Sequence, residues 1–405
     1  MSGVEIFDSK PKTQNLNMQR AIPYMHFRGG SSKGLYFNAK DLPTDESERN
    51  KYILAAMEGS DLGDSRQIDG LGGGSSLSSK VAIVSISELP RVHEGISENI
   101  DEETSTPNPQ SPIPILDYYF VQVMIGKGKV STTQTCGNIL AGVLPFAIES
   151  GMIEATHPTT KALINIVNTG GLCEVMVETP NGQVNYTGNT KVDGVLGTAA
   201  PIICNYLDTE GATCGELFPT GNRIDIVDGK EMTCIDNGMP VVILRASDFN
   251  ITGYETKEEL DSNEALKKEL ENIRLKVGFK MNLSDVTNQS IPKMCLIAPP
   301  RSRDSTPQYS GVVSTRMFIP HVCHDAIGVL AAVSVATACI LPNTITANIA
   351  STPNPPSPTL SIEHPTGEMT VSLETATENG QVMIKKSGVV RTARLLSKGL
   401  VLIPQ

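Results

Sequence analysis

The sequence predicts a mixed α/β protein of two pseudo-symmetric lobes, each a curved, mostly antiparallel sheet or barrel around one central helix. Three observations lead to this prediction. Short runs rich in valine and isoleucine recur along most of the chain, which is typical of strands. Two strongly apolar segments, 135–153 and 324–341, are long enough to be buried helices. These segments and the turns after them also match each other, which indicates a duplicated lobe.

The duplication rests on two pairs of segments that occur in the same order and at nearly the same offset. The run "AGVLPFAI" aligns with "IGVLAAVS" and places Gly142 opposite Gly328. The turn that starts at Glu178 aligns with the turn that starts at Glu363, because each continues to a proline, one residue and a glycine. A ligand site between two such lobes is the expected arrangement.

The domain limits follow from this repeat. We expect a flexible tail at 1–20, a first lobe at 21–205 and a second lobe at 206–405, with the last strands returning to the first lobe. The tail is polar and shows no apolar period. A chain of 405 residues is long enough to form two cores.

The individual elements follow from composition, capping and turn signals. Strands are expected where apolar runs are bounded by glycine or proline turns, and helices where a polar start precedes a longer apolar or amphipathic run. Thr256 and Glu259 form a capping box of this kind. In chain order we expect two strands within 21–38, a helix at 44–59, strands at 80–87 and 117–126, a buried helix at 135–153, a strand and turn at 173–186, a solvent-facing helix at 256–278 and a second buried helix at 324–341. Two polar, proline-rich stretches, 93–114 and 296–311, are expected to be surface loops.

Composition excludes several classes of function. The net charge is −11, and no basic stretch contains interleaved aromatic residues, so nucleic-acid binding is not expected. The eight cysteines do not form a C-x-x-C pair, which argues against a zinc or redox motif. No apolar signal segment is visible, and the longest apolar run, 326–341, is short for a membrane span. We therefore expect a cytoplasmic protein with reduced thiols and no membrane partner.

The stretch "QIDGLGGGSSLSSKVAIV" is a glycine-serine loop that ends in one lysine at the start of an apolar strand. The backbone amides of Gly73, Gly74 and Ser75 can form a nest for an anion. If the strand enters a cleft, partial desolvation makes Lys80 a general base. A solvated lysine at a strand edge is the alternative, and the spacing does not match a nucleotide-binding loop.

Cys136 precedes the first buried helix, so its thiol is expected among unpaired backbone amides at the positive end of that helix. This position favours the thiolate and makes the cysteine a candidate acid or base. Gly137 and Asn138 would let an anionic substrate approach the same amides. A small buried cysteine without a chemical role is the alternative.

Two further places in the sequence are candidates for binding a carboxylate. The turn "FRGGSSKG" again combines glycines, serines and a lysine, with Ser31 and Ser32 as donors. Arg316 and His324 flank the start of the second buried helix, and arginine suits bidentate carboxylate binding. The alternatives are an ordinary hairpin turn and a structural histidine. No acidic cluster has metal-ligand spacing, so neither a metal nor a cofactor is expected.

Five stretches, taken in order, resemble the methylaconitate isomerase family of the PrpF type, which has the diaminopimelate epimerase-like fold. They are "MHFRGGSSKGLYF", "DGLGGGSSLSSKVAIV", "TCGNILAGVLPFAI", "LFPTGNRIDIVDG" and "STRMFIPHVCHDAIGV". The resemblance extends from Ile22 to the C-terminus. Within the family, "RQIDGLGG" and "TCIDNGMPVVIL" look most like the 4-oxalomesaconate tautomerase branch, and the aconitate Δ-isomerases are a close rival.

The resemblance implies a cofactor-independent isomerase that moves a C=C bond in an unsaturated di- or tricarboxylic acid. The implied reaction is an allylic 1,3-proton shift or a cis–trans change in an acid of the aconitate, methylaconitate or 4-oxalomesaconate type. The family's catalytic lysine falls on Lys80 and its helix-capping cysteine on Cys136. Its substrate-binding serines fall on Ser31 and Ser32. The two candidates near the second helix take the places of its clamp arginine and of the histidine eight residues later.

Two departures from the related epimerases bear on the alternatives. Those epimerases use one cysteine from each lobe, whereas the second buried helix starts with "HDAIG" and Cys323 lies before it. Their "GNP" turn reads "GMP" here. An amino-acid racemase or epimerase and a non-catalytic binding protein stay as alternatives to the isomerase. The sequence also leaves open the exact acid and the oligomeric state, a homodimer included.

Overall fold

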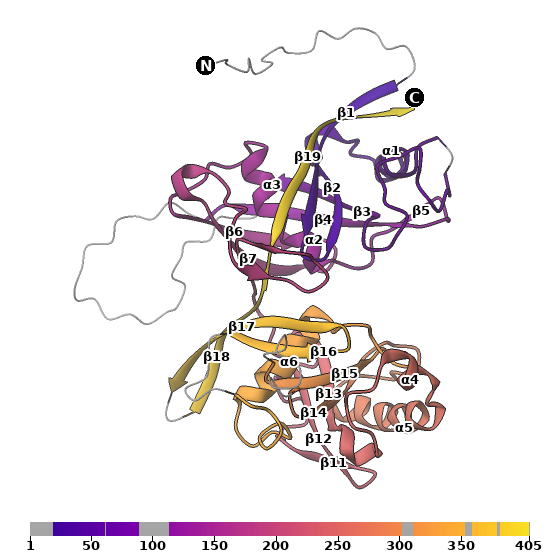
Figure 1. Ribbon diagram of the computed structural model, residues 1–405, viewed down its shortest axis with the longest axis vertical. Helices are drawn as coiled ribbons and strands as arrows, with labels where there is room; N and C mark the ends of the chain where they lie inside the picture. Colours follow the sequence, from indigo (N-terminus) through magenta and orange to yellow (C-terminus); the bar gives the residue numbers. More distant parts are fainter. Residues whose placement is uncertain are drawn as a thin grey trace, which may run out of the picture.

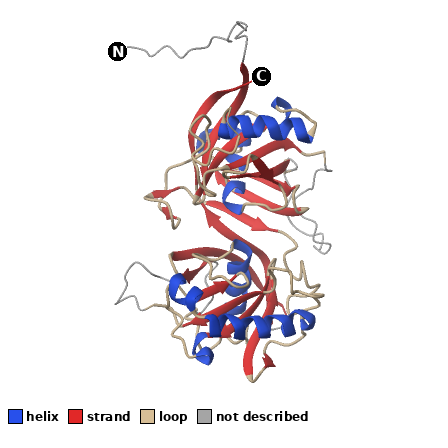
Figure 2. Ribbon diagram, turned by 90° about the vertical axis from the view of Figure 1, so that its right-hand side faces the viewer, coloured by secondary structure: helices blue, strands red, loops and turns tan. Residues whose placement is uncertain are grey.

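The computed structural model describes residues 19–60, 62–88, 113–301, 311–352, 359–378 and 381–404. Figure 1 shows two bodies stacked along the long axis, and Figure 2 shows the same division after a quarter turn. Most of the expected tail, the larger part of the loop expected at 93–114 and residues 302–310 lie outside the described residues.

The chain is rich in strands, which confirms the predicted mixed α/β class. The upper body in Figure 1 contains β1 (Gln19–Gly29), β2 (Ser32–Asn38), β3 (Lys80–Ile86), β4 (Ile115–Met124), β5 (Lys129–Ser131), β6 (Thr159–Ile166), β7 (Gly171–Glu178), β8 (Thr190–Lys191), β9 (Thr198–Ala199), β10 (Ile202–Tyr206) and β19 (Ala393–Pro404). The lower body contains β11 (Asp225–Val227), β12 (Lys230–Asp236), β13 (Pro240–Arg245), β14 (Lys293–Ala298), β15 (Val313–Phe318), β16 (Thr359–His364), β17 (Gly367–Glu378) and β18 (Gln381–Arg391).

The helices are fewer, and they cover or fill these sheets. They are η1 (Ala39–Asp41), α1 (Glu46–Glu58), α2 (Gly137–Leu140), α3 (Val143–Glu149), η2 (Pro180–Gly182), η3 (Ala246–Phe249), α4 (Lys257–Ser262), α5 (Glu264–Lys280) and α6 (Val329–Ile340). The expected strands within 21–38, at 80–87 and at 117–126 are confirmed, as is the helix expected at 44–59. No described helix is long and apolar enough to cross a membrane.

One order of strand pairing occurs twice in the chain. In the upper body β1–β2 is antiparallel, β2–β3 parallel, β3–β4 antiparallel, β4–β6 parallel, and β6–β7 and β7–β10 antiparallel. In the lower body β12–β13, β13–β14, β14–β15, β15–β16, β16–β17 and β17–β18 follow the same series. The buried helices occupy the same place in each series, because α2 and α3 follow β4 while α6 follows β15.

This topology supports one of the two sequence alignments and overturns the other. Gly142 and Gly328 are the N-caps of α3 and α6, so the alignment of the two apolar segments holds. The alignment of the turns is wrong, because the turn after Glu178 follows β7 whereas the turn after Glu363 joins β16 to β17. A short proline-glycine turn can end either kind of strand, so its local sequence does not fix its place in the sheet.

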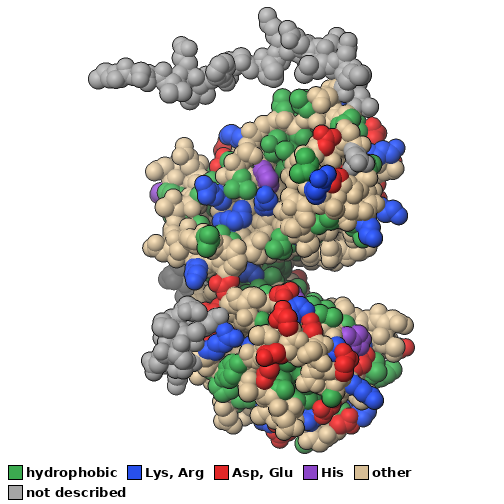
Figure 3. Space-filling model, turned by 45° about the vertical axis from the view of Figure 1, so that its right-hand side comes forward, with side chains coloured by type: hydrophobic (Ala, Val, Ile, Leu, Met, Phe, Trp, Pro, Cys, Tyr) green, Lys and Arg blue, Asp and Glu red, His purple; other side chains and the backbone are tan. Residues whose placement is uncertain are grey.

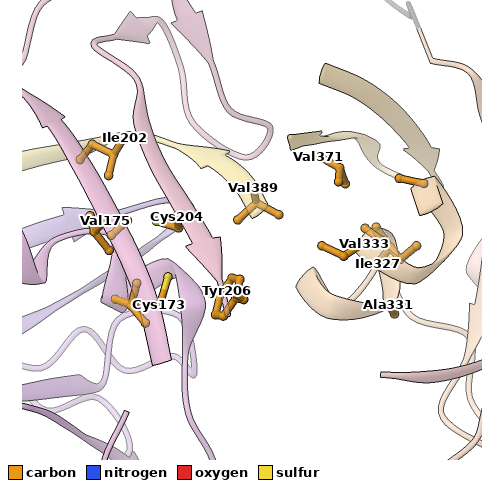
Figure 4. Packing of buried hydrophobic residues seen from close by; sticks show 14 of the residues in the cluster. Cys173, Val175, Ile202, Cys204, Tyr206, Ile327, Ala331, Val333, Val371 and Val389 are labelled. Atoms are coloured by element: carbon orange, nitrogen blue, oxygen red, sulfur yellow. The ribbon is translucent and has the colours of Figure 1, made fainter. Parts of the chain in front are cut away.

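The two bodies are joined by strands that pair across the junction between them. β10 forms antiparallel ladders with β7 on one edge and with β18 on the other. The last strand, β19, returns from the lower body to the upper one. There it pairs with β1 along its whole length, from Gln19 opposite Pro404 to Gly29 opposite Ala393. One cluster of buried apolar residues includes members of both bodies. Figure 4 shows some of them on either side of the junction.

The segment expected to form one helix at 135–153 instead forms two short helices, α2 and α3. The hydroxyl of Tyr36 donates a hydrogen bond of 2.5 Å to the carbonyl of Ile139 at the break. A Cβ atom on Gly142 would lie 2.4 Å from the same hydroxyl, so this position has no room for a side chain. A side chain inserted into the helical hydrogen-bond pattern is a common cause of such breaks.

The helix expected at 256–278 is likewise divided, into α4 and α5. The capping box of Thr256 and Glu259 is present at the start of α4. Asn263 ends α4, and its side chain accepts a hydrogen bond of 3.1 Å from the amide of Leu266. A second N-cap therefore starts α5 one residue after the first helix ends.

Replacing Gly34 with alanine is expected to destabilise the protein by about 1–3 kcal/mol, because the new methyl group overpacks a buried strand. Its Cβ would lie 2.4 Å from the carbonyl oxygen of Lys80, a backbone atom that cannot turn aside. Gly399→Ala is the matched control, since a Cβ there meets nothing nearer than 4.0 Å. Chemical denaturation of both variants measures the difference, and equal stabilities would contradict this account.

Candidate active site

Lys80 is the first residue of β3 and is only 8% exposed. Its Nζ donates a hydrogen bond of 2.7 Å to Oε1 of Gln122 and lies 5.3 Å from the centre of the Phe120 ring. Along β3 it shares a face with Ala82 and Val84, which pack in the core cluster that contains α2 and α3. Among the described residues no carboxylate pairs with this amino group, and the groups that contact it are neutral. A buried lysine without a carboxylate partner fits the general-base hypothesis.

The glycine-serine loop before Lys80 is anchored by Gln67, a residue that the sequence analysis did not single out. Gln67 is 1% exposed, and its Oε1 accepts hydrogen bonds from the amide of Gly74 at 2.9 Å and the hydroxyl of Ser79 at 2.6 Å. The amide of Gly74 is thus already used within the protein. Gly73 and Ser75 are exposed, so the outer part of the predicted nest faces solvent.

The first glycine turn lies against α2. Nδ2 of Asn138 donates a hydrogen bond of 3.2 Å to the hydroxyl of Ser31. A Cβ on Gly30 would lie 2.1 Å from Oδ1 of Asn138, and φ at this glycine is +49°, so the close approach requires glycine. Ser32 is 3% exposed, and its hydroxyl has no hydrogen-bond partner among the described residues. The structure therefore brings Ser31 and Asn138 together, while Ser32 follows in the same turn.

Cys136 is the N-cap residue of α2 and is half-buried. Its carbonyl accepts a hydrogen bond of 3.1 Å from the hydroxyl of Tyr118. Burial holds the pKa of Tyr118 well above its usual value, and the neighbouring Cys136 raises it further, so the hydroxyl keeps its proton. Tyr118, Phe120 and Gln122 alternate along β4 and so share one face. This row of side chains leads from Cys136 to Lys80.

The start of α2 faces the start of α6 across the junction. A Cβ on Gly137 would lie 2.6 Å from the hydroxyl of Tyr206 and 3.6 Å from a methyl group of Val329. Figure 4 shows Tyr206 on the side of the upper body that faces Ile327. Burial, and then the nearby Cys173, raise the pKa of Tyr206 well above its usual value. Tyr206 is a second residue that sequence reasoning missed.

Arg316 and His324 belong to a separate group in the lower body. Arg316 is 1% exposed. Its Nε donates a hydrogen bond of 2.6 Å to the carbonyl of Glu255, and its Nη1 donates one of 2.8 Å to the carbonyl of Thr315. Nδ1 of His324 accepts a hydrogen bond of 2.8 Å from the amide of Ala326. No hydrogen bond or ion pair in the described parts of the chain joins either side chain to Lys80 or Cys136.

Burial explains the titration of this lower-body group. It lowers the pKa of Arg316 from its usual range, with Arg301 as the next cause. It also lowers the pKa of His324 and, together with the nearby His324, lowers that of His364 to about 4. The imidazoles are therefore neutral at physiological pH, and the guanidinium supplies the positive charge.

The hairpin of β8 and β9, residues 190–199, connects the two groups, and we call it the bridging hairpin. The carboxylate of Asp193 accepts a hydrogen bond from the amide of Glu368 in the lower body. The neighbouring Gly194 lies over the upper body, where its Cβ would be 3.3 Å from Cβ of Ser31. At the tip, Leu196 is fully exposed. The sequence analysis did not single out this segment.

Surface charge is distributed unevenly between the two bodies. Figure 3 shows Lys and Arg side chains around a histidine on the upper body, while Asp and Glu side chains gather on the facing part of the lower body. A separate hollow of about 660 Å³ lies between α1 and the ends of β1 and β19, and none of the site candidates lines it. Within the described ranges, no group of three His, Cys, Asp or Glu side chains could hold a metal ion.

Comparisons with known proteins give one consistent result. The family model described as "PrpF protein" matches residues 19–94 and 108–404. The chain is 47% identical to a (4E)-oxalomesaconate Delta-isomerase of Novosphingobium sp. strain KA1, over 96% of this chain and 98% of that protein. It is 46% identical to a 4-oxalomesaconate tautomerase of Pseudomonas putida, over 95% of this chain and 97% of that protein. A crystal structure of methylitaconate-delta-isomerase superposes with a TM-score of 0.78 at 31% identity and covers 95% of this chain and 96% of the other.

Proposed function

The chain belongs to the PrpF family, and on this basis we propose that it isomerises a tricarboxylic acid of the 4-oxalomesaconate type by an allylic 1,3-proton shift. It is an isomerase of unsaturated di- or tricarboxylic acids, as the named relatives are. The choice among these acids rests on identity, because the two oxalomesaconate enzymes are 47% and 46% identical to it and the methylitaconate enzyme 31%.

The observation that carries the proposal is the buried ammonium of Lys80, which has no carboxylate partner among the described residues. As an amine, this group can remove a proton from the carbon beside a carbonyl or carboxylate and leave a dienolate. As an ammonium, it can return a proton to the far carbon of the three-carbon unit, which moves the C=C bond. One base on one face of the substrate is enough for both steps.

The dienolate needs hydrogen-bond donors where its negative charge develops. The amides of Gly137 and Asn138 precede the first backbone bond of α2, which Leu140 makes to the carbonyl of Cys136 at 2.9 Å. The hydroxyl of Ser31, which bonds to Asn138, is a further donor beside α2, and we assign the partnerless hydroxyl of Ser32 to the same role. The thiol of Cys136 is a second acid or base in this proposal.

The lower body supplies the rest of the proposed site. We assign the carboxylate clamp to Arg316 and His324, as the family resemblance implies. The repeated pairing order of the sheets supports two pseudo-symmetric lobes that close on one site, each with its buried helix. We keep the lobe limits of 21–205 and 206–405 as part of this proposal, with the end of β10 at Tyr206 in their support.

An amino-acid racemase is less well supported, because the second thiol that it needs is misplaced. Cys323 is 1% exposed and lies in the core cluster that contains Leu266 and Leu270 of α5. Cys136 packs against a different cluster, which contains α6. At the start of α6 the residue nearest Gly137 is Val329, which has no proton to exchange.

The experiment that tests the function is proton NMR in D₂O with 4-oxalomesaconate, aconitate, methylaconitate and methylitaconate in turn. We expect deuterium at the allylic carbons of the first acid and a shifted C=C bond. Binding of an acid without any solvent exchange would instead indicate a non-catalytic protein. Exchange at the α-carbon of an amino acid such as proline would indicate a racemase.

Lys80→Ala is expected to slow isomerisation by about 10²–10⁴-fold, the usual effect of losing a general base. Lys40→Ala is the matched control, because Lys40 is an exposed lysine outside the candidate site. The initial rate in the NMR assay is the measurement, with circular dichroism to verify folding. A folded Lys80→Ala variant that keeps more than a tenth of the rate would rule out Lys80 as the base.

Cys136→Ser is expected to slow the reaction by roughly 10²–10³-fold without abolishing it, since the α2 amides still bind the substrate. If Lys80 both removes and returns the proton, part of the substrate-derived hydrogen should reach the product before it exchanges. The measurement is the deuterium content of the product in single-turnover reactions. Complete inactivity of a folded variant, together with full deuteration of every wild-type product molecule, would point to a two-base mechanism.

A further inference from the structure

Arg391 is a buried cation that the proposed mechanism does not yet use. It is the last residue of β18 and is 4% exposed. It pairs with Ile202 across the ladder between β18 and β10. Directly paired residues point to the same face, so its side chain lies on the apolar face that also carries Cys204 and Tyr206.

The hydrogen bonds of Arg391 are few and weak for a guanidinium. Nη1 donates a hydrogen bond of 3.0 Å to the carbonyl of the preceding residue, Val390, and Nη2 lies 3.3 Å from the sulfur of Met369. Nε has no hydrogen-bond partner in the described part of the chain. No described carboxylate forms an ion pair with Arg391, although a buried charge without a partner is costly.

The other two fully buried arginines show what a satisfied guanidinium looks like in this protein. Arg274 binds Glu271 through Nε at 2.6 Å and Nη2 at 2.8 Å. Arg316 has two backbone carbonyls within 2.8 Å. Among the described residues Arg391 has neither arrangement, so its guanidinium has donors left for a further partner.

The position of Arg391 suggests what that partner is. Its pKa is lowered by burial, while Tyr206, Cys204 and Cys136 are near enough to raise it. The hydroxyl of Tyr206 in turn lies against Gly137 at the start of α2. Figure 4 shows Cys204, Tyr206 and Val389 together on this face at the junction. Arg391 therefore lies near Tyr206, Cys204 and Cys136, whereas Lys80 bonds to Gln122 of β4.

We propose that Arg391 binds one carboxylate of the substrate, at the end of the molecule remote from the proton transfer at Lys80. A carboxylate can accept bidentate hydrogen bonds from Nε and Nη2, with the thioether of Met369 displaced, which is the geometry that arginine favours. This inference rests on the proposed function and deepens it: the substrate would carry one carbonyl or carboxylate beside the carbon that Lys80 deprotonates and a separate carboxylate at Arg391. A monocarboxylate without a carbonyl group elsewhere could satisfy only one of these requirements.

The test is the binding of tricarballylate, a saturated tricarboxylate with no C=C bond to move, measured by calorimetry. Arg391→Met is expected to weaken binding by about 10- to 150-fold, the range for losing a hydrogen bond to a charged group. Methionine fills a similar volume and removes an uncompensated buried charge, so the variant is expected to fold. Arg391→Lys keeps the positive charge but loses the paired N–H donors of the guanidinium. Its affinity for tricarballylate is expected to lie between those of Arg391→Met and the wild type.

Arg394→Met is the matched control, because Arg394 is exposed and three residues away. It should bind tricarballylate as the wild type does, and an equal loss there would overturn the proposal as a general charge effect. Unchanged affinity in Arg391→Met would also overturn it, whatever the isomerase assay shows. A wild-type protein that binds no di- or tricarboxylate would overturn both this inference and the proposed function. In steady-state assays we expect Arg391→Met to raise KM more than it lowers kcat.

Discussion

The hydrogen-bonded ladders on both edges of β10 are the interaction on which the rest of the structure depends. This strand has five residues, yet it pairs with β7 in one body and with β18 in the other. Because β10 is fixed on both sides, the hydroxyl of Tyr206 is held against Gly137 and the starts of α2 and α6 stay close. Parting the two bodies would break the ladder between Ile202 and Arg391 as well as the apolar cluster that both bodies share.

The charge distribution shows how an acidic protein can serve an acidic ligand. The chain carries a net charge of −11, but Lys80 and Arg391 are buried without carboxylate partners among the described residues. Burial of Arg391 disfavours its charged form and so lowers stability, and the large apolar cores offset that cost. An anion that pairs with such a buried side chain gains more electrostatic free energy than it would beside a surface lysine. The reason is that the effective dielectric constant is lower away from water. Residues that break a rule of stability in this way are expected at functional sites.

The sequence predicted what local patterns determine and failed where distant residues decide. The strands at 80–87 and 117–126 and the capping box at Thr256 follow from nearby residues, and all are present. The break between α2 and α3 depends on Tyr36, which lies about a hundred residues earlier in the chain and reaches Ile139 only after folding. The break at Asn263 does have a local signal, because asparagine is a favoured N-cap residue and lies inside the expected helix.

The candidate site divides in the same way. The glycine turns, Lys80 and Cys136 were recognisable because unusual residue types follow one another in the sequence. Tyr206 was not recognisable, since its contact with Gly137 joins distant parts of the chain. Gln67 lies inside the glycine-serine stretch, but a glutamine there has no distinctive pattern, and only the structure shows its bonds to Gly74 and Ser79. Arg391 sits in the charged run "RTAR" and has the pattern of a surface residue. Only its register opposite Ile202 places it inside.

The pairing of β1 with β19 also delays the completion of the upper body during protein synthesis. Arg28 of β1 bonds to Thr392, which is 364 residues further along the chain. At about 5–20 residues per second, translation leaves β1 without this partner for roughly 20–70 seconds. During that time one edge of the first strand exposes its backbone amides and carbonyls, which is a template for pairing with the wrong chain. The upper body can be completed only after β19 has been made, so the lobe that begins first is completed after the other.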